Sequence, residues 1–264
     1  MKPNNIRDIW ARKGFVVNGW LALPSSFAAE VIAHCGFDSL CVDLQHGLND
    51  YQVATTMLQG ICTTDVTPIL RVHWNDPAII MKSLDAGAMG IICPMINSRE
   101  ECERFVQACR YAPRGYRSSG PIRAMVWAGD DYHAKADDSV ITFAMIETAE
   151  AVRNIDAILS TPELDAVYVG PSDLSITLGG NPGIDQTDPR VVAAIDTIVQ
   201  ACLKHGIHAG IHTGTAAYAK QMIAKGFDFV TMATDSRLLT AAAKKIVADV
   251  RDTDPAAAPK GGVY

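Results

Sequence analysis

Two carboxylates in the second half of the chain could together hold a divalent metal ion. Glu147 ends the apolar segment 141–147, and Asp173 comes shortly after the apolar segment 166–170. Mg²⁺ and Mn²⁺ prefer carboxylate oxygens, and magnesium sites often use only one or two protein carboxylates and leave other positions to water and substrate. In the alternative interpretation Glu147 caps the next helix and Asp173 forms a turn after Gly-Pro, which spacing alone does not exclude.

A second group of polar residues could bind an anion and move a proton. Arg71 lies in the apolar run 67–72 (TPILRV), where a guanidinium needs an anionic substrate or an internal salt bridge to a carboxylate. His46 follows the apolar run 39–45, three residues after Asp43. His46 could therefore be a general base oriented by Asp43, or an ordinary histidine at the junction of a strand and a loop. The side chains of Asp43 and His46 lie at the same end of the strand only if the strand ends between these two residues.

The elements that must position these residues alternate in type along the chain. Helix-like segments include 98–110, which opens on a serine N-cap with acidic residues in its first turn, and 148–160, which begins with Thr148. The near-continuous apolar runs between such segments are typical of parallel strands covered on both faces. The eight predicted strands are 16–23, 39–45, 67–72, 90–95, 141–147, 166–170, 208–213 and 229–233.

Eight strand–helix units in one chain predict the α/β class and a closed (β/α)8 TIM barrel. An open doubly wound sheet is the alternative, but the chain has no GxGxxG or P-loop motif. Active sites of TIM barrels lie at the C-terminal ends of the strands, where the polar residues above fall. The segment 111–140 is too long for an ordinary connection and is predicted to be a functional loop, and the tail from about Asp252 is predicted to be frayed.

Composition excludes several other classes of protein. The chain has 264 residues, 48% of them hydrophobic, and a net charge of −6 without a stripe of Lys or Arg, which argues against nucleic-acid binding. No charge-free apolar run is long enough to span a membrane, and the N-terminus lacks the apolar region of a signal peptide. The seven cysteines form no CxxC pair, which predicts reduced thiols in a cytoplasmic protein.

Several motifs, in this order along the chain, resemble the HpcH/HpaI aldolase family. The resemblance extends from Gly19 to about Arg251 and is carried by the segments 42–46 (VDLQH), 71–77 (RVHWNDP), 113–117 (PRGYR), 145–148 (MIET) and 170–175 (GPSDLS). It implies a barrel of the phosphoenolpyruvate/pyruvate superfamily type. It also implies a class II aldolase that reversibly cleaves 4-hydroxy-2-oxo acids to pyruvate, or a close analogue, and an aldehyde.

The resemblance further implies a role for individual residues. Glu147 and Asp173 would be the ligands of Mg²⁺ or Mn²⁺, with Co²⁺ as a further candidate. Arg71 would polarise the keto oxygen of the substrate, and His46 with Asp43 would form a base dyad. Asp85 would support catalysis, and the substrate would also contact Gly170, Pro171, Ser172, Trp20 and His212.

Three positions depart from the pattern of the family. Gln45 and Met145 stand where many members have glutamate and glutamine, and His212 stands where aldolases of the family often have an apolar residue facing the aldehyde. His212 therefore suggests a more polar acceptor. The resemblance implies a homo-oligomer, often a hexamer built as a trimer of dimers, in which a C-terminal helix of the single barrel domain 1–251 is exchanged between subunits. The rival interpretations are a citrate-lyase-like acyl-CoA lyase and a non-catalytic barrel that binds a 2-oxo acid.

Overall fold

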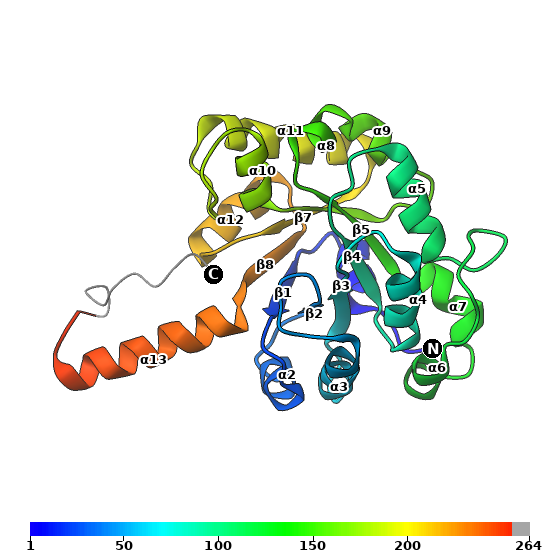
Figure 1. Ribbon diagram of the computed structural model, residues 1–264, viewed down its shortest axis with the longest axis horizontal. Helices are drawn as coiled ribbons and strands as arrows, with labels where there is room; N and C mark the ends of the chain where they lie inside the picture. Colours follow the sequence, from blue (N-terminus) through cyan, green and yellow to red (C-terminus); the bar gives the residue numbers. More distant parts are fainter. Residues whose placement is uncertain (255–264) are drawn as a thin grey trace.

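Eight parallel strands close into a barrel in the computed structural model, which describes residues 1–254 (Figure 1). Neighbours in the barrel are neighbours in sequence, from β1 beside β2 round to β8 beside β1. The predicted TIM barrel is confirmed, with all eight strands at the expected places. They are β1 (Val16–Leu21), β2 (Ser39–Asp43), β3 (Thr67–Arg71), β4 (Gly90–Cys93), β5 (Ile141–Ile146), β6 (Ala166–Val169), β7 (His208–His212) and β8 (Phe229–Thr234).

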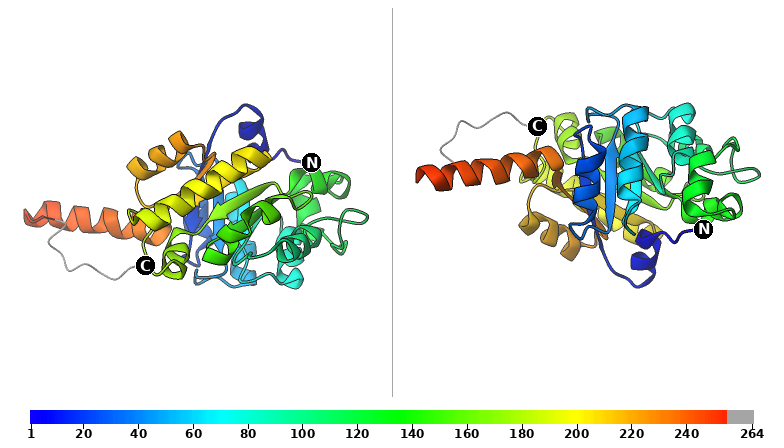
Figure 2. Two further views of the ribbon diagram at one scale, coloured as in Figure 1. Left: turned by 90° about the horizontal axis from the view of Figure 1, so that it is seen from above. Right: turned by 90° about the horizontal axis from the view of Figure 1, so that it is seen from below.

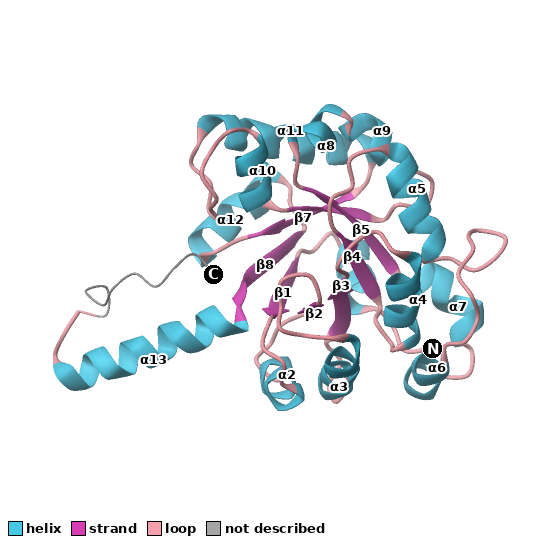
Figure 3. Cartoon of the chain, in the orientation of Figure 1, coloured by secondary structure: helices cyan, strands magenta, loops and turns pink. Residues whose placement is uncertain are grey.

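Helices surround the strands (Figure 3), and many of them begin at a side chain that accepts a backbone N–H of the first turn. Ser98 does this for α5 as predicted, while the predicted helix 148–160 is broken at Asn154 into α8 and α9. The helices are α1 (Asn5–Ala11), α2 (Ser26–Ala33), α3 (Tyr51–Ile61), α4 (Pro77–Asp85), α5 (Arg99–Ala108), α6 (Ile122–Ala128), α7 (Tyr132–Ser139), α8 (Ala149–Arg153), α9 (Ile155–Leu159), α10 (Pro171–Thr177), α11 (Pro189–His205), α12 (Ala216–Lys225) and α13 (Asp235–Arg251).

Two apolar cores hold these layers together. One lies between the strands and the outer helices, and the other fills the barrel with the side chains that the strands point inward. The inner core also contains Ile6 and Trp10 of α1, a helix that the sequence reasoning missed. Trp10 stacks on His208, with ring centroids 3.8 Å apart, and donates to the carbonyl of Asp228, so α1 closes the N-terminal end of the barrel.

The segment 111–140 is not the functional loop that its length predicted. It contains α6 and α7, and it is tied to the N-terminus by hydrogen bonds from Lys2 to Ala128 and from Asn4 to Ser139. Since it connects the end of α5 to the start of β5, it lies at the end of the barrel opposite the predicted catalytic rim. This correction follows from the direction of the chain, which segment length does not reveal.

Helix α13 extends away from the barrel rather than packing along it (Figures 1 and 2). The predicted tail begins just after this helix, and its residues 255–264 lie outside the described part of the chain. No helix within residues 1–254 is long and apolar enough to cross a membrane. All seven cysteines are free, and five of them are buried, in agreement with the prediction of reduced thiols.

Candidate active site

Arg71 and Asp43 form a buried ion pair at the C-terminal rim of the barrel. They stand opposite each other in the register of β2 and β3. The Nε of Arg71 lies 2.8 Å from Oδ1 of Asp43, and Nη2 lies 2.6 Å from Oδ2. The internal salt bridge considered above is therefore present, but it uses only one side of the guanidinium. Nη1 has no hydrogen-bond partner within residues 1–254 and remains available to an anionic or carbonyl oxygen.

Asp43 is the centre of a hydrogen-bond network that holds this arginine in place. Its carboxylate also accepts the indole N–H of Trp20 at 3.2 Å and the backbone N–H groups of Gln45 and His46 at 3.0 and 3.3 Å. Burial favours the protonated form of Asp43, but the charge and hydrogen bonds of Arg71 outweigh it and lower the pKa of the carboxyl. Asp43 therefore stays ionised and fixes the plane of the guanidinium.

The predicted contact between Asp43 and the imidazole of His46 is absent from the described structure. Asp43 binds the backbone amide of His46 instead, and the imidazole is exposed at the rim. This part of the prediction was wrong because Arg71 and Trp20 occupy both carboxylate oxygens. Asp43 thus positions the loop that carries His46, while the imidazole is free to approach a ligand.

Glu147 and Asp173 lie on the same rim, at the ends of β5 and β6. Glu147 is buried, and its Oε1 accepts the backbone N–H of Met95 at 2.8 Å. Asp173 is exposed, in the first turn of α10. Burial, together with the charge of Asp173, raises the pKa of Glu147 to about 7, against the opposing effects of the Met95 amide and of Arg71. The two carboxylates and Arg71 are therefore close enough to interact electrostatically.

The chemistry of this pair fits a divalent cation. No donor within residues 1–254 bonds to Oε2 of Glu147 or to the Asp173 carboxylate. A Cβ at Gly170 would lie 2.6 Å from that Oε2, so glycine keeps one side of the oxygen open. The described residues contain no cluster of three or more His, Cys, Asp or Glu side chains suited to a metal. Magnesium sites often take only one or two carboxylates from the protein and fill their other positions with water or substrate.

Trp20 connects the arginine to a second polar pair. The guanidinium of Arg71 lies 4.8 Å from the centroid of the indole, and the ring of His212 meets the indole edge-on at 5.1 Å. Nδ1 of His212 lies 3.0 Å from the hydroxyl of Tyr168. Burial, and next the charge of Arg71, lower the pKa of His212 to about 3, so this imidazole is neutral at physiological pH. The structure thus brings Trp20 and His212 to the rim beside Arg71.

Asp85 is the predicted site residue that the structure places elsewhere. It is the last residue of α4, which returns to the N-terminal end of the barrel before β4. There it pairs with the buried Arg117, whose Nη2 lies 2.9 Å from Oδ1. A role for Asp85 at the rim of its own chain is therefore corrected to a structural ion pair at the opposite end.

Three further predicted residues line the approach to Glu147 from the start of α10. Gly170 is the N-cap of this helix, Pro171 is its buried first residue, and Ser172 donates its hydroxyl to the carbonyl of Gly183 at 3.0 Å. Pro171 has no N–H and the N–H of Gly170 donates to Ile146, so what the start of α10 offers a ligand is the backbone N–H groups of Ser172 and Asp173.

Sequence reasoning missed two contributions to the site. Met95 supplies the amide that orients Glu147, from a left-handed backbone with φ of 56° that no sequence motif announces. Tyr168 lies in the middle of β6, and its phenol inside the apolar run AVYV was the available signal.

The structure also shows where the two departures from the family pattern at Gln45 and Met145 lie. Oε1 of Gln45 is buried without a partner in the described residues, and Met145 packs beside Gly170, next to Oε2 of Glu147.

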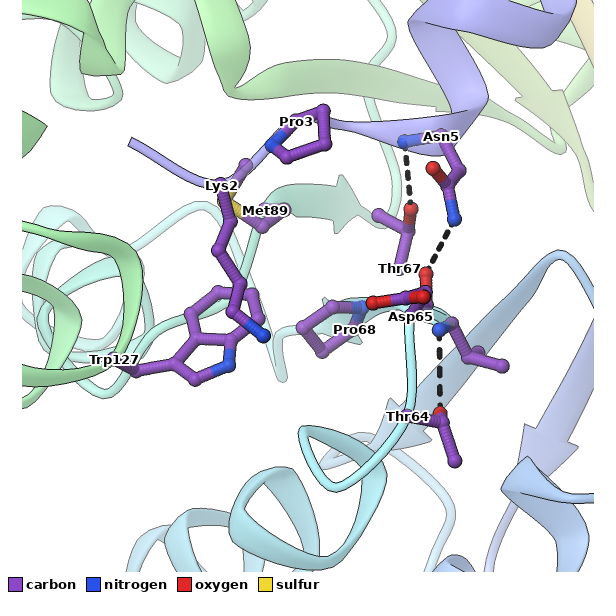
Figure 4. A pocket seen from close by; sticks show the side chains of 10 residues that line it. Lys2, Pro3, Asn5, Thr64, Asp65, Thr67, Pro68, Met89 and Trp127 are labelled. Atoms are coloured by element: carbon purple, nitrogen blue, oxygen red, sulfur yellow. Dashed lines mark hydrogen bonds between the residues drawn. The ribbon is translucent and has the colours of Figure 1, made fainter.

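A separate cavity of about 300 Å³ opens at the other end of the barrel (Figure 4). Its lining comes from the N-terminal segment with Lys2, from the start of β3 with Thr67, and from α6 with Trp127. None of the predicted site residues contributes to it. The candidate active site is therefore defined by the charged residues of the rim and not by this cavity.

Comparison with known proteins shows which family this chain resembles. The family model described as HpcH/HpaI aldolase/citrate lyase matches residues 18–242. The chain is 42% identical over 248 residues to the hydroxypyruvate/pyruvate aldolase of Rhizorhabdus wittichii, covering 94% of this chain and 99% of the relative. It is 38% identical over 250 residues to the 4-hydroxy-2-oxo-heptane-1,7-dioate aldolase of Escherichia coli, covering 93% of each.

Solved structures give the same result. A HpcH/HpaI aldolase/citrate lyase family protein from Burkholderia cenocepacia superposes with a TM-score of 0.88 at 29% identity, covering 94% of this chain and 99% of that one. The HpcH/HpaI aldolase from Desulfitobacterium hafniense superposes with a TM-score of 0.86 at 25% identity, covering 94% and 97% of the two chains.

Proposed function

This chain belongs to the HpcH/HpaI aldolase/citrate lyase family, and from that premise we propose that it is a class II aldolase, a carbon–carbon lyase, that cleaves 4-hydroxy-2-oxo acids to pyruvate or a close analogue and an aldehyde. One observation carries the proposal: a buried arginine with a free Nη1 shares one rim with two under-coordinated carboxylates. That rim matches a small 2-oxo acid, which presents a carboxylate and a keto oxygen to a cation and an arginine.

Each residue then has a defined task. Arg71 donates from Nη1 to the keto oxygen and stabilises the negative charge that develops on it, while Asp43 holds the guanidinium plane. Glu147 and Asp173 would hold Mg²⁺, Mn²⁺ or Co²⁺. When bound there, the ion supplies further positive charge that stabilises the enolate. The backbone N–H groups of Ser172 and Asp173, in the first turn of α10, would receive the substrate carboxylate, since Pro171 has no N–H and that of Gly170 donates to Ile146.

His46 is the proposed general base. Its imidazole is exposed at the rim, and the hydrogen bond from its backbone to Asp43 fixes the loop that carries it. His46 takes the proton of the C4 hydroxyl, the C3–C4 bond breaks, and its electrons pass to the keto group to give the enolate of pyruvate. The C4 carbon leaves as the aldehyde, and protonation at C3 completes pyruvate. Condensation follows the reverse course.

Removal of divalent metal is expected to abolish pyruvate release, because the two carboxylates then repel each other and Arg71 alone is left to stabilise the enolate. The measurement is pyruvate formation, coupled to lactate dehydrogenase, before and after extensive dialysis against EDTA. Added Mg²⁺ or Mn²⁺ should restore activity, and pyruvate added to the coupling system alone controls for the reporter. Full activity after thorough chelation would exclude the metal. Turnover of CoA thioesters without turnover of free 2-oxo acids would instead favour an acyl-CoA lyase.

We also propose a homo-oligomer, as a hexamer, in which α13 is exchanged between subunits of the domain 1–251. Helix α13 exposes a set of apolar side chains, and only Asp235 and Ala248 of its residues are buried. Asp235 anchors the start of the helix by accepting the amides of Ala22 and Leu23 at 3.0 and 3.1 Å. The exposed apolar side chains are Leu238, Leu239, Ile246, Val247 and Val250.

We propose that the protein works in the cytoplasm. Its seven cysteines are free thiols, which suits a reducing compartment.

The double substitution Leu239→Asp and Ile246→Asp is expected to shift the protein towards smaller species, because both side chains are exposed within one chain and would be buried by a partner. Light scattering after size-exclusion chromatography gives the mass directly. Lys244→Gln, on the same helix, is the matched control and should leave the mass unchanged. An oligomer that survives the double substitution would contradict the exchange of α13.

A further inference from the structure

A line of buried polar side chains runs through the barrel towards His212. Ser39, Asn18 and Thr231 come from β2, β1 and β8, and all three are fully buried. The hydroxyl of Ser39 donates to Oδ1 of Asn18 at 2.7 Å, and Nδ2 of Asn18 donates to Oγ1 of Thr231 at 3.0 Å. Buried polar groups in a barrel interior are costly unless their hydrogen bonds are complete. The proposed mechanism gives these three residues no task, so the line requires its own explanation.

Tyr168 lies between Thr231 and His212, and the direction of its hydrogen bond to His212 can be assigned. Thr231 accepts from Asn18, so its own hydrogen is free for the phenol of Tyr168. Burial raises the pKa of Tyr168 well above its usual value, and the nearby hydroxyl of Thr231 opposes this rise. We assign the phenol as the donor to Nδ1 of His212, 3.0 Å away, because a phenol with a raised pKa keeps its hydrogen. A neutral imidazole that accepts at Nδ1 carries its proton on Nε2.

The Nε2–H group of His212 points to no partner within the described chain. The side chain is partly exposed at the rim, and Nδ1 makes its only recorded hydrogen bond. Three charged groups act on this imidazole: Arg71 at the end of β3, Asp43 at the end of β2, and Arg237 at the start of α13. Burial and the two arginines disfavour the imidazolium, so the ring remains a neutral N–H donor.

The Nε2–H donor of His212 is left for the second substrate, the acceptor aldehyde. The keto oxygen of the 2-oxo acid is already assigned to Arg71, and its carboxylate to the start of α10. The indole of Trp20 contacts both the guanidinium of Arg71 and the imidazole of His212, whose own partners are Trp20 and Tyr168. We propose that His212 donates a hydrogen bond from Nε2 to an oxygen substituent of the acceptor aldehyde, and that the enzyme therefore selects hydroxy- or oxo-substituted aldehydes over alkyl aldehydes of the same size. Tyr168 and Thr231 are positioning residues in this assignment, which rests on the proposed function.

The test compares two acceptors that differ only by a hydroxyl and a methyl group, glycolaldehyde and propanal, each condensed with pyruvate by the Mg²⁺-loaded enzyme. The ratio of their kcat/KM values is expected to favour glycolaldehyde in the wild type. His212→Leu should lower that ratio by ~10-fold or more, the usual effect of removing a hydrogen bond to a substrate oxygen. His212→Gln should recover part of the ratio, because its side-chain amide again offers an N–H.

Tyr168→Phe tests the positioning. It removes the hydroxyl that fixes the tautomer of His212, and it should lower the ratio in the wild-type background but not further in His212→Leu. Tyr132→Phe is the matched control, since its buried hydroxyl bonds to Arg117 at the other end of the barrel and the ratio should not change. An equal effect of His212→Leu on both aldehydes overturns this assignment and leaves the proposed aldolase standing. A folded, metal-loaded wild type that condenses neither aldehyde overturns the proposed function and this assignment with it.

Discussion

Arg71→Ala is expected to abolish aldol cleavage and also the exchange of pyruvate methyl protons with solvent. Both reactions pass through the enolate, and Nη1 of Arg71 is the free cationic donor at the place where that charge develops. Loss of one donor of this kind typically costs ~10²–10³-fold in kcat. Pyruvate release and deuterium incorporation into pyruvate, followed by proton NMR, measure the two reactions separately.

The substitution also leaves Asp43 buried without its partner, so loss of folding must be distinguished from loss of chemistry. Arg71→Lys keeps a positive charge but cannot reproduce the two parallel bonds to Asp43, and should retain only a small part of the activity. Arg110→Lys is the matched control, because Arg110 is also buried and pairs with Asp165 near the start of β6, far from the rim. Proton exchange that persists in a folded Arg71→Ala protein would remove Arg71 from the mechanism.

The fold could be predicted from the sequence because its signal is local. Each strand is an apolar run bounded by polar residues, and eight such runs suffice to specify the barrel. The parts that failed depend on tertiary contacts. Helix α1 is short, and its purpose appears only when Ile6 and Trp10 fill the open end of the barrel. The two helices in 111–140 likewise pack around Tyr111 and Tyr132, a small core that no periodicity shows.

The site was predictable to the extent that strand ends determine it. Asp43, Arg71, Glu147 and His212 all end strands or directly follow them, so the topology of the barrel brings them to one rim. Which of these side chains bind one another was not predictable, because partners are chosen by side-chain reach across the rim. Asp43 is three residues from His46 in sequence, yet its carboxylate binds Arg71 on the next strand.

Glu147→Gln is expected to lower aldolase activity by on the order of 10²-fold or more, because loss of a direct ligand should cost at least as much as loss of the groups that orient ligands. The amide has nearly the same shape, so the hydrogen bond from Met95 can persist while the charge is lost. Activity at saturating Mg²⁺ and the metal concentration for half-maximal activity are the measurements. Glu150→Gln, an exposed carboxylate on α8, is the matched control and should leave both unchanged.

The stability of the metal-free protein separates this role from a structural one. The folded protein raises the pKa of Glu147 to about 7, chiefly by burial, so the carboxylate binds its proton more tightly folded than unfolded. The stabilisation from this more tightly bound proton is fully present below the unfolded pKa of about 4.3 and is lost as the pH rises through about 7.

Without metal, the wild type should therefore lose stability relative to Glu147→Gln between pH 5 and 8, with a higher Tm for the variant at pH 8. Added Mg²⁺ should raise the Tm of the wild type far more than that of the variant, since only the wild type keeps both carboxylates. A variant that is less stable than the wild type at pH 8 without metal, and equally stabilised by Mg²⁺, would show that Glu147 supports the fold rather than the cation.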